Sequence, residues 1–240
     1  MVKIGIAGIC GKMGKRIADL ASKDPDIELV IGLERENDPL VGKQEKGVIV
    51  TADPGKACEG IDCLIDFTLP GPTLDHVRVC REKVVPMVIG TTGFDPQAEE
   101  VIRLAAEVIP IVFSPNMAVG VNLLFNIVRE MAKVLGRDFN IKIDETHHVH
   151  KKDSPSGTAK MISSVIKKAS GKDVPIEAFR EGEVIGNHGI IFDGEFETLE
   201  IRHNAKSRDV FAAGALQAAK FVVDKMPGLY SMADVLGLGK

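Results

Sequence analysis

The sequence lacks the features that define several classes of protein. Its four cysteines form no CxxC pair and no regular spacing, so we expect free thiols in a reducing compartment rather than a disulfide framework. No apolar run approaches the roughly 20 residues that span a bilayer, which argues against a membrane protein. The 30 Lys and Arg residues are outnumbered by 34 Asp and Glu residues, so the chain lacks the basic excess typical of nucleic-acid-binding proteins.

The start of the chain also lacks the marks of an export signal. The segment from Met1 to Gly8 has no basic region followed by an extended apolar stretch and a cleavage site. We therefore expect a cytoplasmic protein. Hydrophobic residues make up 45% of the chain, which is enough for a sizeable core without metal ions or disulfides.

The first half of the sequence alternates β-rich runs with helical patterns. Short runs rich in Val and Ile predict strands buried on both faces at Val2–Ala7, Glu28–Leu33, Leu64–Phe67, Pro86–Ile89 and Ile109–Phe113. Apolar residues at helical spacing predict helices between them at Lys12–Ser22, Thr73–Glu82 and Gln97–Glu107. This alternation predicts an α/β, Rossmann-type parallel sheet with right-handed crossovers.

The pattern changes near residue 114 and predicts a second domain of the α+β class. We expect helices at Ala118–Leu135 and Thr158–Ala169, and strands at Asn140–Thr146, Ile190–Phe192 and Thr198–Arg202, the last two with one solvated face. A final Ala-rich helix, Val210–Lys225, is expected to return to the first domain. The predicted division is residues 1–117 plus 208–240 for the first domain and 118–207 for the second.

A Gly-rich turn follows the first predicted strand. Gly8, Gly11 and Gly14 have GxxGxxG spacing, and glycine there allows a tight turn and a close approach of the backbone to a pyrophosphate. The second strand ends at Glu34, which can accept hydrogen bonds from an adenine ribose, and the adjacent Arg35 suits a 2′-phosphate. The pattern indicates a dinucleotide site that accepts NADH and NADPH. The alternative is a turn that binds nothing, with Glu34 merely solvated.

Two further loops end neighbouring predicted strands. They are Gly90-Thr91-Thr92-Gly93 and Ser114-Pro115-Asn116-Met117. Ligands of parallel α/β sheets bind beyond the carboxyl ends of the strands, so we expect the first loop near a nicotinamide and the second beside the cofactor. Each could instead be an ordinary connection.

The densest chemical signal lies between Glu145 and Ala159. Three of the six histidines, His147, His148 and His150, fall within four positions and precede two lysines. Imidazole, with a pKa of about 6.5, suits proton donation near neutral pH. In an extended chain His147, Val149 and Lys151 would share one face, and His148 and His150 the other.

A predicted helix opens directly after this cluster. It begins at Ser156-Gly157-Thr158, where exposed N–H groups and hydroxyls form a site for a carboxylate or phosphate. The segment therefore predicts a small anionic ligand that also takes up a proton.

Two other interpretations of this segment compete with an anion site. His148 and His150 could bind zinc with Asp144, Glu145 or Asp153, but flanking lysines and the lack of a nearby cysteine oppose this, so we predict no metal. The segment could also be a solvated polar loop without a role.

Together these residues resemble the 4-hydroxy-tetrahydrodipicolinate reductase family, formerly called the dihydrodipicolinate reductases. The resemblance covers nearly the whole chain and is most specific in the HHxHK…SPSGTA segment. Other matching segments are the Gly8–Gly14 turn, Glu34-Arg35, Gly90–Gly93, Ser114–Met117 and Ser207-Arg208 followed by Phe211–Leu216.

The resemblance implies an oxidoreductase of lysine and diaminopimelate biosynthesis. The substrate would be dehydrated 4-hydroxy-tetrahydrodipicolinate, a cyclic dicarboxylate, and the cofactor NADH or NADPH. The first domain would be a Rossmann domain, and the second would bind substrate and build a homotetramer.

The resemblance also assigns roles by position. His147 matches the proton donor and Lys151 the second catalytic residue. His148, Gly157 and Thr158 match contacts to the substrate carboxylates, and Ser156 joins them from the helix-start pattern above. Cofactor contacts carry over to Gly8, Ile9, Cys10, Gly11, Lys12, Met13, Glu34, Arg35, Gly90, Thr91, Thr92, Ser114, Pro115, Asn116 and Met117.

Two positions depart from the family pattern. Cys10 holds a place that is often Gly, and Ser154 one that is usually Ala. Strict alternation would also turn His148 away from Lys151, so the chain must leave extended geometry if both contact substrate.

Two alternative functions would keep part of the pattern. A related two-domain amino-acid dehydrogenase would retain the Gly-rich turn and Glu34 but lack the segment from His147 to Ala159. A non-catalytic NAD(P)-sensing module would need neither His147 nor Lys151.

Overall fold

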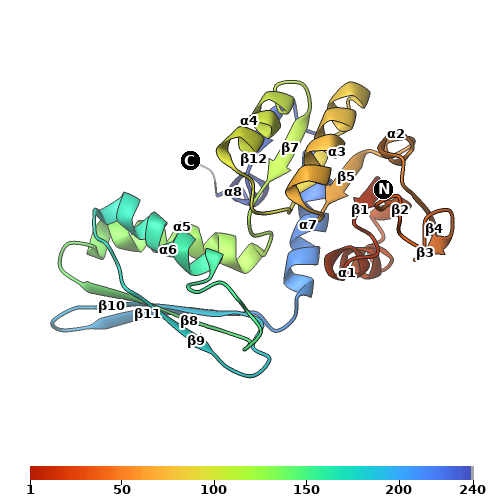
Figure 1. Ribbon diagram of the computed structural model, residues 1–240. Helices are drawn as coiled ribbons and strands as arrows, with labels where there is room; N and C mark the ends of the chain where they lie inside the picture. The colour runs from red at the N-terminus through yellow and green to blue at the C-terminus, as the bar shows by residue number, and fades with distance from the viewer. Residues whose placement is uncertain (239–240) are drawn as a thin grey trace. The chain divides into compact units, whose positions relative to one another are not determined.

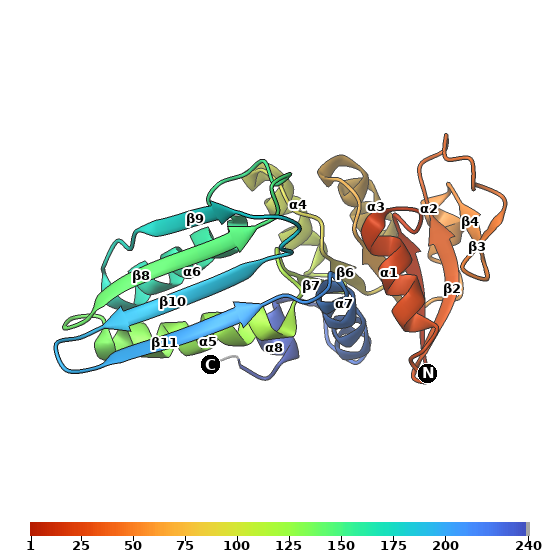
Figure 2. The same cartoon turned by 90° about the horizontal axis from the view of Figure 1, so that it is seen from below.

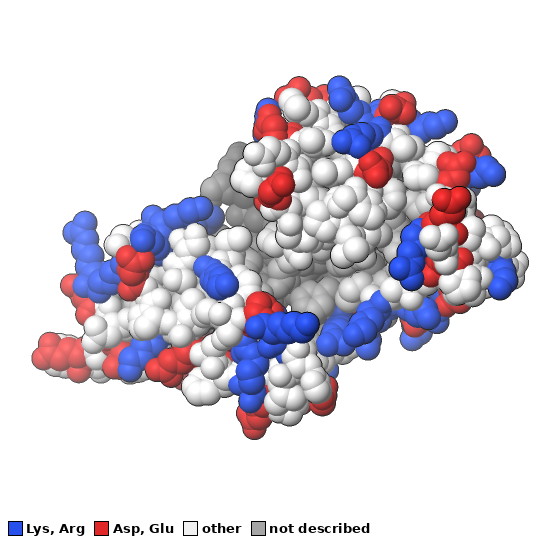
Figure 3. Space-filling view, viewed as in Figure 1, with Lys and Arg blue, Asp and Glu red and all other residues white. Residues whose placement is uncertain are grey.

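The computed structural model describes residues 1–238, which fall into two compact units (Figure 1). The first unit is Met1–Ala118 with Phe211–Lys240, and the second is Val119–Val210. None of the described helices is long and apolar enough to cross a membrane. On the face drawn in Figure 3, acidic and basic side chains are interspersed.

The first unit is built on an eight-stranded sheet in the order β12-β7-β6-β5-β1-β2-β4-β3. All neighbours pair in parallel except β3, which is antiparallel to β4. The strands are β1 (Val2–Ala7), β2 (Ile27–Leu33), β3 (Gln44–Glu45), β4 (Val48–Thr51), β5 (Cys63–Asp66), β6 (Met87–Ile89), β7 (Pro110–Phe113) and β12 (Gly228–Tyr230). The helices are α1 (Lys12–Ala21), α2 (Pro54–Ala57), α3 (Pro70–Lys83), α4 (Pro96–Ala105), α8 (Met232–Val235) and α7 (Asp209–Val222), which lies mostly in this unit. The predicted α/β class is confirmed.

Two hydrophobic cores cover the two faces of this sheet. Successive side chains of a strand point to opposite faces. Ile4 and Ile6 of β1 therefore join a core with α1 and α7, while Ala7 joins a second core with α3 and α4. β5, β6 and β7 are buried almost throughout, as predicted. The middle of β2 is only half-buried, contrary to the prediction, because β4 pairs with Gly32 and Leu33 alone and leaves the earlier part of that edge open.

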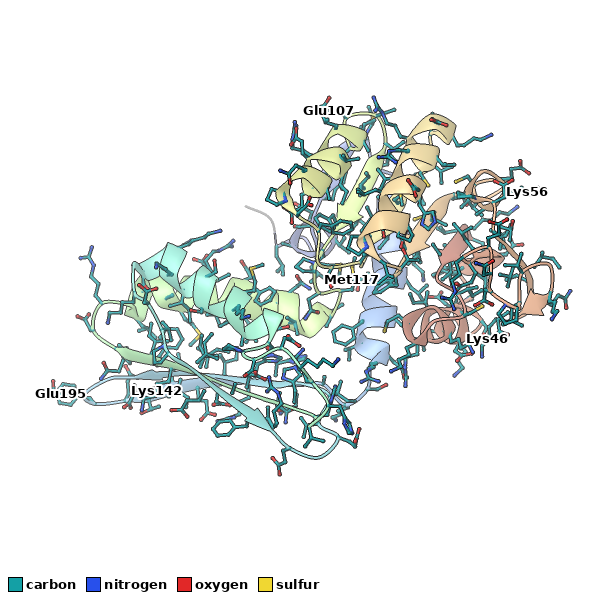
Figure 4. All side chains as sticks on the ribbon, in the orientation of Figure 1. Lys46, Lys56, Glu107, Met117, Lys142 and Glu195 are labelled. Carbon is teal, nitrogen blue, oxygen red and sulfur yellow. The ribbon has the colours of Figure 1, made fainter. Side chains whose placement is uncertain are left out.

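Helix α7 packs closely against the end of the β7 segment. A Cβ atom built on Gly214 would lie 1.7 Å from the backbone oxygen of Met117, a residue labelled in Figure 4. The Ala-rich sequence of this helix therefore allows a backbone-to-backbone approach that a larger side chain at Gly214 would prevent.

The second unit is a four-stranded sheet with two helices. The strand order is β11-β10-β8-β9, where β9 is parallel to β8 and the other pairs are antiparallel. The strands are β8 (Asn140–His147), β9 (Ile176–Arg180), β10 (Asn187–Asp193) and β11 (Thr198–Asn204), and the helices are α5 (Val119–Leu135) and α6 (Gly157–Ser170). Both helices lie on one face of the sheet (Figure 2), and their apolar sides form a third core with residues such as Ile143 and Phe192.

Several short elements were not predicted from the sequence. These are strands β3, β4, β9 and β12 and helices α2 and α8. Each has five residues or fewer, too short for a hydrophobic period to be evident.

Candidate functional site

The Gly-rich turn of the first unit forms a cradle at the start of α1. Gly8 has φ +79°, a conformation that favours glycine, and accepts a hydrogen bond from Gly11 N at 2.9 Å. A Cβ on Gly14 would lie 2.1 Å from the Gly8 oxygen, so the turn requires glycine there too. Gly11 caps α1 without a side-chain hydrogen bond, which leaves N–H groups of the first turn available to an anion. The turn therefore fits a pyrophosphate.

A pocket of about 470 Å³ opens beside this turn. It brings together five of the predicted cofactor residues, namely Gly8, Cys10, Gly11, Glu34 and Arg35. It is also lined by residues that the sequence analysis did not single out, which are Leu33, Asp38, Phe67, Thr68, Leu69, Pro72 and His76. The backbone N–H of Cys10 donates to Glu34 Oε1 at 2.9 Å, so the acidic residue after β2 is tied directly to the Gly-rich turn.

The other predicted cofactor loops do not line this pocket. Thr91 is buried, Thr92 is exposed, and a Cβ on Gly90 would lie 2.2 Å from the Phe67 ring. Ser114 donates its hydroxyl to the Asn116 backbone oxygen at 2.9 Å, and Asn116 Oδ1 accepts from Ala118 N at 2.9 Å.

A buried carboxylate that the sequence analysis missed fixes the loop after β5. Asp66 is fully buried and contacts His76 Nδ1 at 2.7 Å. It also accepts hydrogen bonds from the Thr68 N–H at 3.0 Å and the hydroxyls of Thr68, Thr73 and Thr91 at 2.7, 3.1 and 3.3 Å. This network ties Thr91 to the Thr68 and His76 side of the pocket. The signal for it was an acidic residue at the end of the apolar strand Cys63–Asp66.

In the second unit, strand β8 presents Glu145 and His147 on its buried face. The alternation that buries Ile141 and Ile143 continues to these two polar residues, and Glu145 is fully buried. His147 Nδ1 is hydrogen-bonded to Glu145 Oε2. Continuing the two-residue period of Ile141 and Ile143 would have found this pair in the sequence.

The Glu145 carboxylate takes part in three hydrogen bonds. Besides His147, it accepts from the Ser156 backbone N–H at 3.0 Å and from Arg180 Nη1 at 3.1 Å. Burial alone would raise the pKa of Glu145, but these partners lower it below its ordinary value, so the group is a carboxylate. Burial lowers the pKa of His147, with help from Lys151 and Arg180, while Glu145 opposes that lowering.

Two further histidines lie beside His147. The β8–β10 register places His188 opposite Glu145, and the rings of His147 and His188 meet edge to face at 5.2 Å. His203 on β11 follows at 6.2 Å from His188. Burial and the neighbouring imidazoles lower the pKa of His188 to about 4, so it is neutral at physiological pH. Neither residue was predicted from the sequence, because both belong to strands distant from β8 along the chain.

The chain turns directly after His147, so the sharing of faces expected of an extended chain does not continue beyond that residue. β8 ends at His147, and the Lys151 N–H donates to the His148 backbone oxygen at 3.1 Å. The loop after β8 has left the sheet, and the Val149 N–H donates to the Gly182 backbone oxygen at 3.2 Å. Lys151 Nζ lies 2.7 Å from Asp153, and the buried Nδ1 of His148 has no hydrogen-bond partner among the described residues.

Helix α6 begins where predicted, with Ser156 as its N-cap. The buried Ser156 hydroxyl accepts from Ala159 N at 3.1 Å and lies 3.3 Å from His188 Nε2. Gly157 is exposed, and a Cβ built there meets no atom within 4 Å. The space beside Gly157 at the helix start is therefore open, which leaves room for a carboxylate.

Comparisons with solved structures place this fold among known dehydrogenases and reductases. A dipicolinate-bound dihydrodipicolinate reductase from Paenisporosarcina sp. TG-14 matches with TM-score 0.86 and 24% identity over 98% of both chains. A diaminopimelate dehydrogenase from C. glutamicum matches with TM-score 0.61 and 14% identity over 96% of this chain and 92% of that one. At these identities the likeness shows the fold alone.

The sequence comparisons are more specific. Residues 2–117 match the model "Dihydrodipicolinate reductase, N-terminus" and residues 120–236 match "Dihydrodipicolinate reductase, C-terminus". The 4-hydroxy-tetrahydrodipicolinate reductase of Nitrosospira multiformis is 40% identical over 264 residues, covering 99% of this chain and 98% of the relative. That of Geotalea daltonii is 40% identical over 267 residues, covering 99% and 100%. The predicted resemblance is confirmed, and the chain belongs to the dihydrodipicolinate reductase family of NAD(P)H-dependent oxidoreductases.

Proposed function

We propose that this protein reduces dehydrated 4-hydroxy-tetrahydrodipicolinate to tetrahydrodipicolinate in lysine and diaminopimelate biosynthesis, with His147 as the proton donor. The observation that carries the assignment of His147 is its hydrogen bond to the fully buried Glu145, whose other oxygen is bound by the backbone at the start of α6. A proton-donating group and an anion site are thereby joined through one carboxylate.

The cofactor is NADH or NADPH, which supplies the hydride when bound. The open N–H groups at the start of α1 hold its pyrophosphate, within the turn formed by Gly8, Ile9, Cys10, Gly11, Lys12 and Met13. Glu34 and Arg35 receive the adenine ribose. The loops Gly90–Thr92 and Ser114–Met117 complete the cofactor contacts.

The substrate carries two carboxylates. Gly157 and Thr158 bind one of them at the start of α6, where a negative charge is favoured by the helix dipole. Ser156 fixes this helix start, because its N–H is bound to Glu145 and its hydroxyl to Ala159 N. His148 and Lys151 assist, and Lys151 neutralises the negative charge that gathers on the substrate during reduction.

The hydrogen bond to Glu145 decides which nitrogen of His147 gives up the proton. Since Nδ1–H is held by Glu145, Nε2 is the atom that carries the transferable proton. Nε2 lies close to the buried residue Gly186. A Cβ atom built on Gly186 would be 2.9 Å from His147 Nε2. The lowered pKa of His147 makes its protonated form a stronger acid.

The substitution His147→Gln tests the proposal. Loss of a positioned acid typically costs about 10²- to 10⁴-fold in rate, so kcat should fall by that factor while cofactor affinity stays within about twofold. His150→Gln is the matched control, since the His150 side chain is three-quarters exposed and its ion-pair partner, Glu183, is exposed too. The measurement is substrate-dependent loss of reduced-nicotinamide absorbance. An unchanged kcat in His147→Gln would exclude His147 as the donor.

We also infer the division of labour and the assembly. Residues 1–117 plus 208–240 bind the dinucleotide, and residues 118–207 bind substrate and assemble a cytoplasmic homotetramer. Exposed apolar side chains on the sheet of the second unit, Phe179 at 50% and Leu199 at 46%, support an interface there. Light scattering of the purified protein should give four times the monomer mass, and a monomer would refute the assembly.

A further inference from the structure

The dinucleotide pocket contains an acidic corner formed by Cys10, Glu34 and Asp38. The Cys10 sulfur and one carboxylate oxygen of each acid lie within 4.8 Å of one another, and all three residues line the pocket. Glu34 was predicted from the sequence, but the second acid, Asp38, was not. The corner adjoins the place where Glu34 receives the ribose.

Backbone hydrogen bonds fix both carboxylates. Glu34 accepts from Cys10 N at 2.9 Å and from Arg35 N at 3.3 Å. Asp38 ends a turn in which its own N–H donates to the Arg35 oxygen at 2.9 Å, and its Oδ1 accepts from Leu40 N at 3.0 Å. The two negative charges are therefore held in the corner and cannot turn away without losing hydrogen bonds.

Cys10 adds no positive charge to balance them. Burial and the charges of Glu34 and Asp38 raise the pKa of its thiol to about 11, so the thiol stays neutral and is hydrogen-bonded to Asp38. Among the described residues that line this pocket, Arg35 is the one Lys or Arg side chain, against the carboxylates of Glu34 and Asp38. The corner can accept hydrogen bonds from hydroxyl groups, whereas a dianion placed there meets like charge.

We propose that Asp38 is a specificity-determining residue that makes this protein bind NADH more tightly than NADPH. The inference rests on the proposed function, because it concerns the cofactor of that reaction. A free ribose 2′-hydroxyl donates to the acidic corner. A 2′-phosphate carries a charge of about −1.5 to −2 at pH 7 and is repelled by Asp38 in addition to Glu34. At about 6 Å in water, this added repulsion corresponds to roughly a tenfold change in affinity.

The test measures binding without any turnover. Isothermal titration of the full-length protein with ADP-ribose and with 2′-phospho-ADP-ribose, at low salt, compares ligands that differ only in the 2′-phosphate. The variant is Asp38→Asn, whose amide oxygen can still accept from Leu40 N. The control is Asp26→Asn, which removes the same charge directly before β2, at the opposite end of the strand from Glu34; the seven residues of β2 rise roughly 23 Å.

Wild-type protein and Asp26→Asn should favour ADP-ribose by about tenfold or more, and Asp38→Asn should reduce this ratio about tenfold by tightening the 2′-phosphate ligand. Added salt should bring the affinities of the wild-type protein for the two ligands closer together, because it screens the repulsion. A wild-type preference for the 2′-phosphate ligand, or an unchanged ratio in Asp38→Asn, would overturn the inference alone. Failure of the wild-type protein to bind either ligand would instead overturn the proposed function.

Discussion

Removing the charge of Glu145 should shift the pH range in which the enzyme works. Glu145 is fully buried and bonds to His147 Nδ1, to Ser156 N at 3.0 Å and to Arg180 Nη1 at 3.1 Å. The substitution Glu145→Gln keeps the size of the side chain but removes its charge and one acceptor oxygen. The protonated form of His147 thereby loses its stabilising partner, whereas burial and the cations Lys151 and Arg180 continue to disfavour it.

The expected shift follows from the strength of that partner. Hydrogen bonds to charged groups contribute about 1.5–3 kcal/mol, and one pKa unit corresponds to about 1.4 kcal/mol, so the pKa of His147 should fall by roughly one to two units. A proton donor must be protonated, so the rate falls as pH rises through its pKa. In Glu145→Gln this fall should begin one to two pH units lower, and kcat/KM near pH 7 should drop about 10- to 100-fold.

The assay is the pH profile of kcat/KM, followed by reduced-nicotinamide absorbance, together with Tm at each pH. Glu177→Gln is the control, because Glu177 is an exposed carboxylate on the adjacent strand β9. Its profile should match that of the wild-type protein. If Glu145→Gln lowers Tm and rate but leaves the profile in place, Glu145 supports the fold and does not tune His147.

Two predictions concern stability. Gly214→Ala should lower the free energy of unfolding by several kcal/mol, since its Cβ would lie 1.7 Å from the Met117 oxygen. Gly71→Ala, with open space around its Cβ, should leave stability unchanged or raise it by up to about 1 kcal/mol. Equal urea midpoints for the two variants would refute the close approach of Gly214 to Met117. His188 has a pKa of about 4 when folded and about 6.5 when unfolded, so only the unfolded chain takes up its proton between these values. The free energy of unfolding should therefore fall by up to about 3 kcal/mol as pH drops from 6.5 to 4. In urea titrations over that range, His188→Gln should lose less stability than the wild-type protein. An equal loss in both proteins would exclude His188 as the source of this pH dependence.

Local periodicity was enough to predict most of the fold. Five strands of the first unit and its three longer N-terminal helices lie within a few residues of the predicted ranges, because apolar residues recur there at the period of each element. Strand β12 was missed because it has three residues and gains its stability from pairing with β7, more than a hundred residues earlier. A local sequence pattern does not indicate a pairing partner so far away in the chain.

The candidate site divides in the same way. The segment from His147 to Thr158 could be located because its residues are close in sequence. Arg180 and His188 could not, since the registers that set them opposite His147 and Glu145 join β8 to strands 30 to 45 residues later. Asp38, which also lines the pocket, was not predicted because it lies in a turn, and a turn has no hydrophobic period.

The departure at Cys10 shows why a side chain is tolerated inside the Gly-rich turn. Gly8 has φ +79°, and a Cβ on Gly14 would collide with the Gly8 oxygen, so these two positions require glycine. Among the described residues, Lys46 and Val84 are the non-glycine residues with positive φ, so Cys10 lies in the ordinary backbone region. What the turn requires of position 10 is its backbone N–H, which Cys10 donates to Glu34. The Cys10 side chain contacts Asp38, so a cysteine at this position keeps the backbone of the turn and adds a thiol to the acidic corner.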